Sequence, residues 1–165
     1  MAQQSPAEKQ AKFTAYYAQY YNEFFRYACY FLGNREDAED AVSDALVSAF
    51  RNFDSLRSEE KFKQWFMKIL QNICKTMLKN RSKKPMSVDE DPDDIRFAST
   101  DTDCDGKTDI QKALGILKPE DKSLILLSVE GGYSSDEIAE IMSMSAGNVR
   151  VRIHRAYAKL REALC

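Results

Sequence analysis

Hydrophobic residues recur at helical spacing along two stretches of the chain, on either side of a polar stretch. In the first stretch, apolar residues that end before Gly33 share one side of a helix, at positions 13, 16, 17, 20, 24, 27 and 31. Their aromatic rings would also suit stacking on nucleic-acid bases, but the helical period favours packing in a core. Asn34 with Asp37 matches a helix cap and its third-position acid, and an apolar stripe over 38–53 predicts a second helix.

A third helix is predicted from Phe62, because apolar residues at 62, 65, 66, 69, 70, 73, 77 and 78 share a face. At 100° per residue, five polar residues fall within about 40° of one another on a neighbouring face. We call these residues the basic stripe: Lys61, Lys68, Asn72, Lys75 and Lys79. Like charges this close repel each other unless an anion neutralises them, so we interpret the stripe, together with Lys63, as a phosphate-binding surface. A solvated surface is the alternative.

The second stretch predicts shorter helices. A helix over about 110–117 precedes one that starts at Pro119 and stops at Gly131. Ser134 with Glu137 then matches a capping box in front of a helix of about two turns. A long helix follows, so this part of the chain has the order of a helix-turn-helix.

The last helix is predicted over about 146–164, with Ser145 as its cap. Apolar residues at 149, 153, 156, 157 and 160 form one side. The other side of its first turns carries the residues predicted to contact DNA: Asn148, Arg150, Val151, Arg152 and Arg155. Arginine suits guanine and asparagine suits adenine in the major groove, but Arg152 and Arg155 could equally hold phosphates. His154 is interpreted as a packing or phosphate-contacting residue rather than a catalytic one.

Charge is segregated along the chain, although the formal net charge is only −2. Positions 61–84 hold eight basic residues and no acid, whereas in 85–109 nine acids stand against two bases. From position 146 onward, five bases stand against one acid. Two basic ends that cancel an acidic centre are typical of a nucleic-acid-binding protein whose total charge hides its binding surfaces.

The acidic centre is predicted to be a linker over 83–107, between domains at 10–82 and 108–165, because it has two prolines and no apolar period. Some 25 extended residues reach at most about 80 to 90 Å. One and a half turns of DNA span roughly 50 to 55 Å. The linker can therefore let both domains touch one stretch of DNA about one and a half turns long.

The composition of the chain argues against a metal site, a cofactor site and most kinds of catalytic site. The four cysteines are scattered without a Cys-x-x-Cys pair and there is a single histidine, so we predict no metal site and no cofactor. A Gly-rich phosphate loop and a Ser-His-Asp set are also missing, and we predict that the protein is not an enzyme. The first ten residues lack the apolar stretch of a secretory signal, and no apolar run is long enough for a membrane span. We expect a cytoplasmic protein without membrane insertion.

Two long segments resemble the bacterial extracytoplasmic-function (ECF) type of RNA polymerase sigma factor. The segment from YYNEFF to KNRSKK resembles sigma region 2, and the segment from QKALGI to KLREAL resembles sigma region 4. The most specific parts are EDAED at 36–40, the Phe-x-x-Trp start of the third helix, and DEIAEIM followed by SAGNVRVRIHRAYAKLR. The resemblance implies an all-α fold, in which a region 2 bundle of three to four helices and a region 4 helix-turn-helix are joined by a flexible acidic linker.

The resemblance also implies roles for particular residues. The second helix would contact the clamp coiled coil of the largest polymerase subunit through Asp37, Asp40, Ser43 and Asp44; a solvated acidic face is the other interpretation. The third helix and the loop before it, 55–63, would meet the upstream edge and the flipped-out base of the minus-ten element. The last helix, with Ser145 at its start, would read the minus-thirty-five element. The partners are then core polymerase and promoter DNA, and an anti-sigma factor is left open.

Three residues depart from the family pattern. Ser43 stands where glutamine is usual, Thr76 where an acid is frequent, and Ser143 where glycine is common in the turn. Trp65 could act as a strand-opening wedge, but its place at the edge of the apolar stripe favours core packing. A helix-turn-helix regulator that acts without polymerase is the main rival function, and it leaves the acidic second helix unexplained. A protein-binding adaptor leaves the basic segment at 61–84 unexplained.

Overall fold

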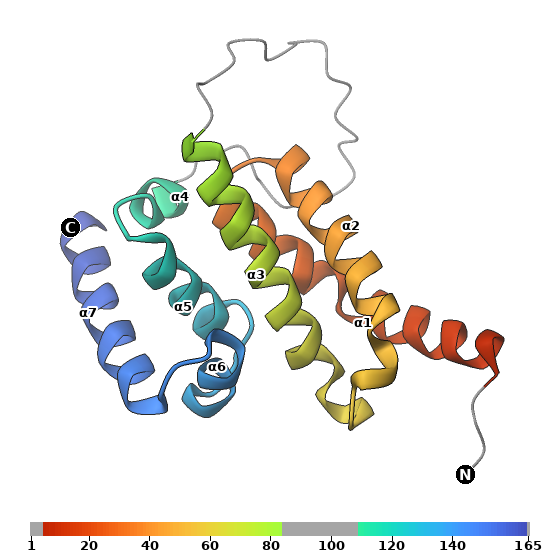
Figure 1. The fold of residues 1–165 in the computed structure, drawn as a ribbon. Coiled ribbons are helices and arrows are strands. Elements are labelled where there is room, and N and C mark those ends of the chain that lie inside the picture. The colour runs from red at the N-terminus through yellow and green to blue at the C-terminus, as the bar shows by residue number, and fades with distance from the viewer. Residues whose placement is uncertain (1–4, 84–108, 165) are drawn as a thin grey trace, which may run out of the picture.

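A computed structural model describes residues 5–83 and 109–164, and within these ranges every regular element is a helix (Figure 1). The first range holds three long helices, α1 (Pro6–Leu32), α2 (Arg35–Arg51) and α3 (Phe62–Lys83). Two short 3-10 turns, η1 (Phe53–Ser55) and η2 (Glu59–Lys61), connect α2 to α3. The prediction of an all-α fold is confirmed for the described residues.

The second range holds four helices. They are α4 (Asp109–Leu114), α5 (Pro119–Val129), α6 (Ser135–Met142) and α7 (Ala146–Leu164). Helices α6 and α7 are joined by three residues, Ser143, Met144 and Ser145. This is the short helix, tight turn and long basic helix that the sequence predicts.

Local side-chain chemistry sets the ends of the first helices. Helix α1 begins earlier than its apolar pattern predicts, because the Ser5 side chain accepts a hydrogen bond from the Glu8 backbone N–H (3.2 Å) and Pro6 opens the first turn. It ends at Gly33, whose φ of 82° is the left-handed conformation that glycine adopts without strain. Asn34 caps α2 as predicted, accepting from the Asp37 N–H at 2.8 Å.

The helix-turn-helix has caps at each junction. Ser134 and Glu137 form both bonds of the predicted capping box at the start of α6. Helix α6 ends at Ser143, which adopts a left-handed φ of 55° although it is not glycine. Ser145 starts α7 by accepting from the Asn148 N–H at 3.1 Å, as predicted.

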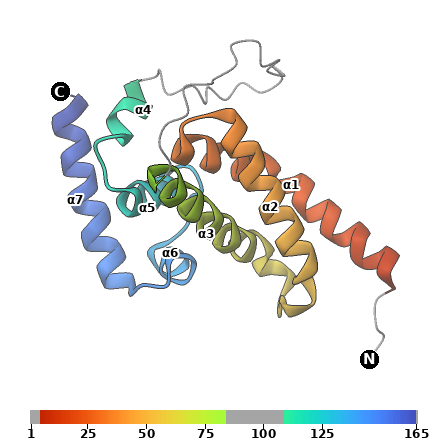
Figure 2. The same cartoon turned by 45° about the horizontal axis from the view of Figure 1, so that its top comes forward.

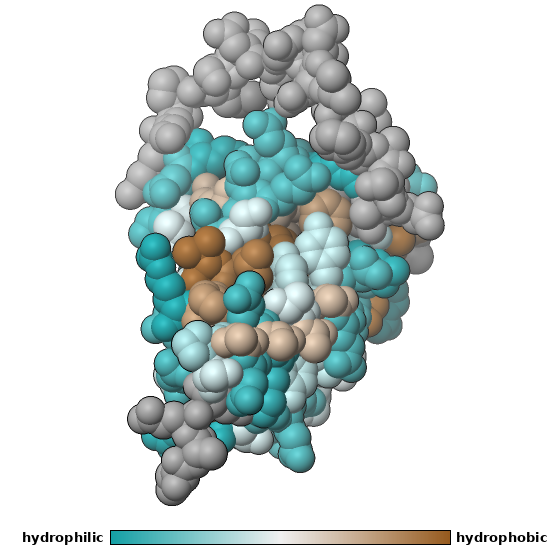
Figure 3. All heavy atoms as spheres, turned by 90° about the vertical axis from the view of Figure 1, so that its right-hand side faces the viewer, coloured by the Kyte–Doolittle hydropathy of each residue, from teal (hydrophilic) through white to brown (hydrophobic). Residues whose placement is uncertain are grey.

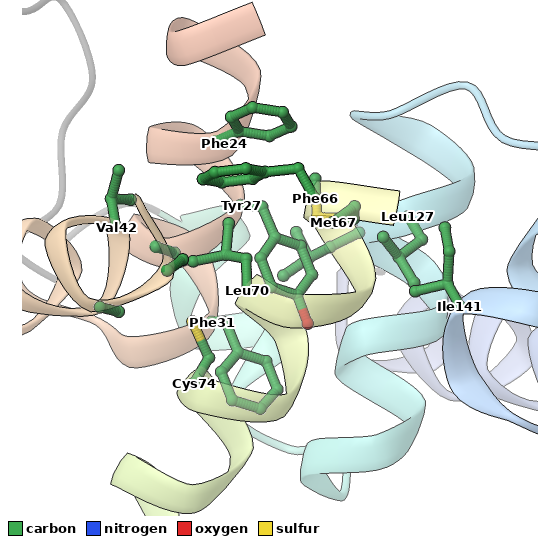
Figure 4. Close-up of a cluster of buried hydrophobic side chains, with 14 of the residues drawn as sticks. Phe24, Tyr27, Phe31, Val42, Phe66, Met67, Leu70, Cys74, Leu127 and Ile141 are labelled. Atoms are coloured by element: carbon green, nitrogen blue, oxygen red, sulfur yellow. The ribbon is translucent and has the colours of Figure 1, made fainter. Parts of the chain in front are cut away.

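The core of the first three helices is largely aromatic. Phe66 of α3 is fully buried and stacks on Phe24 of α1, with ring centroids 4.2 Å apart. Figure 4 shows this cluster continuing beyond α3 to Leu127 of α5 and Ile141 of α6. The described helices therefore share one continuous apolar core.

Helices α5 and α6 pack on the first three helices, with α5 against α1 and α6 against α3 (Figures 1 and 2). Polar bonds cross this boundary, which we call the seam. Tyr27 of α1 and Ser123 of α5 share a buried hydrogen bond of 2.6 Å. Across the same seam, the Lys122 ammonium donates to the Phe31 carbonyl at 2.8 Å and the Gln71 amide donates to the Ile141 carbonyl at 3.2 Å.

The predicted linker at 83–107 lies outside the described residues, except that Lys83 is the last residue of α3. In the described parts of the chain, no helix combines the length and apolar character that crossing a membrane requires. These same parts hold no cluster of three or more histidine, cysteine or carboxylate side chains able to bind a metal ion.

Candidate nucleic-acid interface

The basic stripe lies along the solvent-facing side of α3. Amphipathic spacing buries Phe66 and Leu70, and this leaves Lys68, Asn72 and Lys75 exposed in successive turns. Lys61, at the end of η2, and Lys79, further along α3, are also exposed. Lys68 and Lys75 make no ion pair with any residue in 5–83 or 109–164. The structure therefore brings the five predicted residues onto one exposed face.

Lys63 occupies a different environment from the stripe. Its ammonium makes an ion pair with Glu23 at 3.0 Å, donates to the Gly131 carbonyl at 3.2 Å and lies 4.7 Å from the centre of the Tyr133 ring. These partners belong to α1 and to the connection between α5 and α6, so Lys63 lies in the seam. Helical spacing alone indicates this separation. Lys63 follows Lys61 by two residues, which rotates its side chain by 200° around the helix, away from the stripe.

The loop 52–61 between α2 and α3 folds as two 3-10 turns around a buried Phe53. Trp65 is half-buried next to the loop. Its ring centroid lies 5.9 Å from that of Phe62 and 6.4 Å from that of Phe53. The interpretation of Trp65 as a packing residue agrees with these contacts. Between the two turns, Leu56, Arg57 and Ser58 face a cleft.

This cleft, of about 650 Å³, separates the loop from the helix-turn-helix. One wall holds loop residues together with Lys61, Trp65 and Lys68, and the other holds the end of α6 and the turn through Ser145. Gln64 of α3 donates a hydrogen bond to Glu140 of α6 beside it. The structure thus places residues predicted for the minus-ten element directly opposite the cap of the helix predicted for the minus-thirty-five element.

The first turns of α7 present the predicted recognition residues to solvent. Asn148, Arg150 and Arg155 are exposed, and Val151 is 48% exposed. Val149 and Ala156 anchor the opposite side of the helix in the core. This arrangement leaves a polar surface of suitable length for the major groove.

Arg152 differs from its neighbours because it is held within the second helical unit. Its guanidinium makes ion pairs with Glu120 at 3.0 Å and with Asp121 at 2.8 Å, both at the start of α5. Burial acts to lower the pKa of Arg152, but the hydrogen bond to Glu120 and the charge of Asp121 raise it overall. Arg152 therefore holds α7 on α5, a role that the residues around it in the sequence did not indicate.

The outer face of α2 carries the residues predicted to contact polymerase. Asp40, Ser43 and Asp44 are exposed in the first half and middle of the helix. Asp37 is half-buried and accepts hydrogen bonds from Asn34, at 3.0 Å, and from Arg81 of α3. Asp37 therefore ties α2 to α3, while the other three face outward.

The outer face of α2 continues with apolar residues that the sequence prediction did not include. Val47 is 50% exposed and Phe50 is 39% exposed. Figure 3, which views the side where α1 and α2 lie in Figure 1, shows apolar atoms gathered among hydrophilic ones. The spacing 40, 44 and 47 was the available signal, because it follows a single helical face from two acidic residues to the apolar Val47.

Comparison with protein families matches both helical units. The family described as "Sigma-70 region 2" matches residues 16–84, and the family described as "Sigma-70, region 4" matches residues 107–160. The two matches occur in the order that the sequence resemblance implies.

Individual proteins are similar along most of the chain. An RNA polymerase sigma factor, SigV of Bacillus subtilis, is 31% identical over 140 residues, which cover 84% of this chain and 82% of SigV. The ECF RNA polymerase sigma factor SigE of Mycolicibacterium smegmatis is 29% identical over 152 residues, and the match spans 88% of this chain but 59% of SigE. Among solved structures, the sigma factor RpoE of Bartonella quintana in complex with the anti-sigma factor NepR has a TM-score of 0.69 at 25% identity, covering 91% of this chain and 96% of RpoE.

Proposed function

The chain belongs to the ECF family of sigma factors, which direct RNA polymerase to promoters, and we propose that three of its surfaces divide this task. The outer face of α2 binds core polymerase. The loop 52–61 and the basic stripe bind the minus-ten element, and the first turns of α7 read the minus-thirty-five element. Residues 10–82 and 108–165 act as the two domains, with 83–107 as the acidic linker between them.

The observation that carries the DNA part of this proposal is the basic stripe. Lys68, Asn72 and Lys75 are exposed in line, and neither lysine is neutralised by a carboxylate among the described residues. Phosphates of a DNA strand running along α3 would supply the missing counter-charge. Lys63 is excluded from this role while it is bound in the seam.

On α7, base recognition and positioning are divided between neighbouring residues. Asn148, Arg150 and Arg155 are exposed and can reach base edges or phosphates in the major groove. Arg152 instead fixes α7 on α5 through Glu120 and Asp121. A rigid recognition helix loses less conformational freedom when it binds.

The polymerase-binding surface combines charge with apolar area. Asp40 and Asp44 lie exposed beside each other, and Val47 and Phe50 extend the same side of α2. Apolar side chains that remain exposed next to charged ones are typical of a protein-binding surface. We propose that all four contact the polymerase clamp and that Asp37 acts indirectly, by holding α2 on α3.

The packed arrangement has to open before a promoter binds. The minus-ten surface and Ser145, the cap of the minus-thirty-five helix, line one cleft here, whereas the two DNA elements lie roughly 50 to 55 Å apart on a duplex. The similar Bartonella quintana protein was solved with an anti-sigma factor bound. We propose that an anti-sigma factor would hold this chain in the packed form and that core polymerase selects the open form. No step requires a covalent bond to form or break, and we place the protein in the cytoplasm with the polymerase.

The salt dependence of promoter binding tests the role of the stripe. In complex with core polymerase, Lys75→Ala should reduce the slope of log affinity against log salt by about one unit, because one fewer counterion is released. Lys68→Ala with Lys75→Ala should reduce it by about two units. Fluorescence anisotropy of a labelled promoter at several salt concentrations gives these slopes.

Lys112→Ala is the matched control, because it removes one exposed lysine from α4. Its slope should equal that of the unmodified protein. If the stripe variants also keep the full slope, the stripe is ordinary surface and this part of the proposal is wrong.

A further inference from the structure

The first turns of α1 are fastened to the loop 52–61. The Lys9 ammonium makes an ion pair with Asp54 of η1 at 3.1 Å. One turn further along, the Lys12 ammonium donates to one carboxylate oxygen of Glu59 in η2, also at 3.1 Å. The next turn brings the Tyr16 hydroxyl to the other oxygen of Glu59, to which it donates at 2.9 Å. Three consecutive turns of one helix therefore hold both turns of the loop.

Aromatic packing lies beneath these polar bonds. Phe13, which is buried, meets Phe53 and Phe62 edge to face, with ring centroids 5.4 and 5.6 Å away. Tyr16 stacks on Phe62 at 5.1 Å. Both ends of the loop thus rest on α1, and the residues between them, 56–58, line the cleft together with Ser55 and Lys61.

The same bonds determine the direction in which the acidic side chains of the loop lie. Asp54 and Glu59 would repel the phosphates of a DNA strand if they faced the cleft. The hydrogen bond from Tyr16, followed by the one from Lys12, lowers the pKa of Glu59. Glu59 therefore stays ionised and directed toward α1, and neither it nor Asp54 lines the cleft.

We propose that Lys12 and Tyr16 are positioning residues for strand capture, which hold Glu59 and so keep the loop shaped to receive an unpaired base of the minus-ten element. This inference rests on the proposed function, because it requires the loop to meet that element. A loop that is already ordered binds the base with higher affinity, because less conformational freedom is lost on binding.

Lys12 and Glu59 are nearly half exposed, with side chains 44% and 47% accessible. Exposed ion pairs contribute little to overall stability. Loss of this contact should therefore affect the loop much more than the fold, and this difference separates a positioning role from a general structural one.

The test uses the complete protein bound to core polymerase, at a promoter located by mapping transcript starts. The promoter carries 2-aminopurine at each non-template minus-ten position in turn, so that a base leaving the stack becomes fluorescent. Lys12→Ala combined with Tyr16→Phe should lower affinity for the single-stranded minus-ten strand by about three- to tenfold, as expected for two solvent-exposed bonds. Protection of the minus-thirty-five element and affinity for core polymerase should not change.

Conservative variants make the test specific. Lys12→Arg alone keeps a cation that can pair with Glu59. This variant should give the fluorescence signal of the unmodified protein. Tyr30→Phe removes a hydroxyl from the same helix far from the loop, and it should behave like the unmodified protein. The thermal midpoint of the double variant should lie within about 2 °C of the original.

Two results would overturn the inference. One is a double variant that captures the strand as well as the unmodified protein does. The other is a variant that loses strand capture, minus-thirty-five protection and core binding to the same extent, because that pattern indicates general damage. Failure of the proposed function is distinguishable, since the unmodified protein would then give no promoter-dependent signal at all.

Discussion

The two helical units achieve their packing by different means. Residues 5–83 bury seven phenylalanines, whereas residues 109–164 rely mainly on leucine, isoleucine and valine, with Tyr133 as their buried aromatic residue. The smaller unit also presses Leu127 and Ile141 against the first (Figure 4). Small domains bury too little surface to be very stable alone. The comparison indicates that the first unit supports itself and that the second depends on the seam.

The seam holds the second unit packed on the first through polar bonds as well as apolar contacts. Its bonds include a buried contact, Tyr27 with Ser123, and half-buried ones such as Lys122 with the Phe31 carbonyl. Burial lowers the pKa of Lys122, and the nearby charge of Arg81 adds to this. Polar bonds of this kind specify one arrangement, yet they add less net stability than an apolar interface of equal size. We propose that this combination of polar bonds and apolar contacts allows the seam to open when polymerase binds.

The largest expected effect comes from Phe66→Ala. Removing a fully buried aromatic ring should lower the free energy of unfolding by about 3 to 5 kcal/mol. Since α5 and α6 pack on the same core, hydrogen exchange should become faster in both units. Protection that remains intact in α5 to α7 would show that the second unit does not depend on the first.

Leu127→Ala is the reciprocal change. It removes a fully buried side chain from α5 and should cost about 2 to 5 kcal/mol. Faster exchange should be confined to α4 to α7, because the aromatic core of α1 to α3 remains complete. If α1 to α3 lose protection to the same degree, the two units form one cooperative body and the comparison fails.

Alkaline pH should weaken the seam. Burial raises the pKa of Tyr27 well above its usual value. The folded state therefore keeps this proton when the unfolded chain loses it near pH 10, so stability is complete below about pH 10 and falls as the pH rises further. Tyr27→Phe should make this loss less steep, by up to about 1.4 kcal/mol per pH unit.

Urea unfolding between pH 9 and 11.5 measures that slope. Ser123→Ala is the control, because it removes the same hydrogen bond and leaves the buried phenol in place. It should keep the steep loss. Equal slopes for Tyr27→Phe and the unmodified protein would contradict the assignment.

The smallest effect concerns two helix ends with the same backbone conformation. Gly33 ends α1 with φ of 82°, and Ser143 ends α6 with φ of 55°. Glycine adopts this region without strain, whereas a side chain with a Cβ makes it costly. Ser143→Gly should therefore stabilise the second unit by up to about 1 kcal/mol, and Gly33→Ala should destabilise the first by about as much. A Cβ at Gly33 would meet nothing within 4 Å, so its cost is purely conformational. Thermal unfolding of both variants checks the opposite signs.

Much of the fold was predictable because its determinants are local. Asn34, the Ser134 and Glu137 pair, and Ser145 act within three residues of themselves, and each caps the predicted helix. Apolar periodicity likewise identified α2, α3 and α7. The early start of α1 was missed, because Ser5 and Pro6 set it in a stretch without an apolar stripe, and α4 ends at Leu114 rather than near position 117.

The seam was not predictable, because its partners are distant in the sequence. Tyr27 and Ser123 are 96 positions apart, and Lys122 and Phe31 are 91 apart. For the same reason, charge and spacing alone could not separate Arg152, which binds two acids of α5, from the exposed Arg150. Helical periodicity identifies the side on which a residue lies, but it does not identify the element that covers that side.

The most direct measurement of the central claim is transcription reconstituted from purified components. Core RNA polymerase, the purified protein and fragmented genomic DNA of the source organism are combined, and transcript starts are mapped. We predict starts that require both the protein and core polymerase and that share two conserved DNA elements at a fixed spacing. Lys68→Ala with Lys75→Ala should weaken these starts, most strongly at high salt. The account is contradicted if no start depends on the protein while the protein alone footprints duplex DNA.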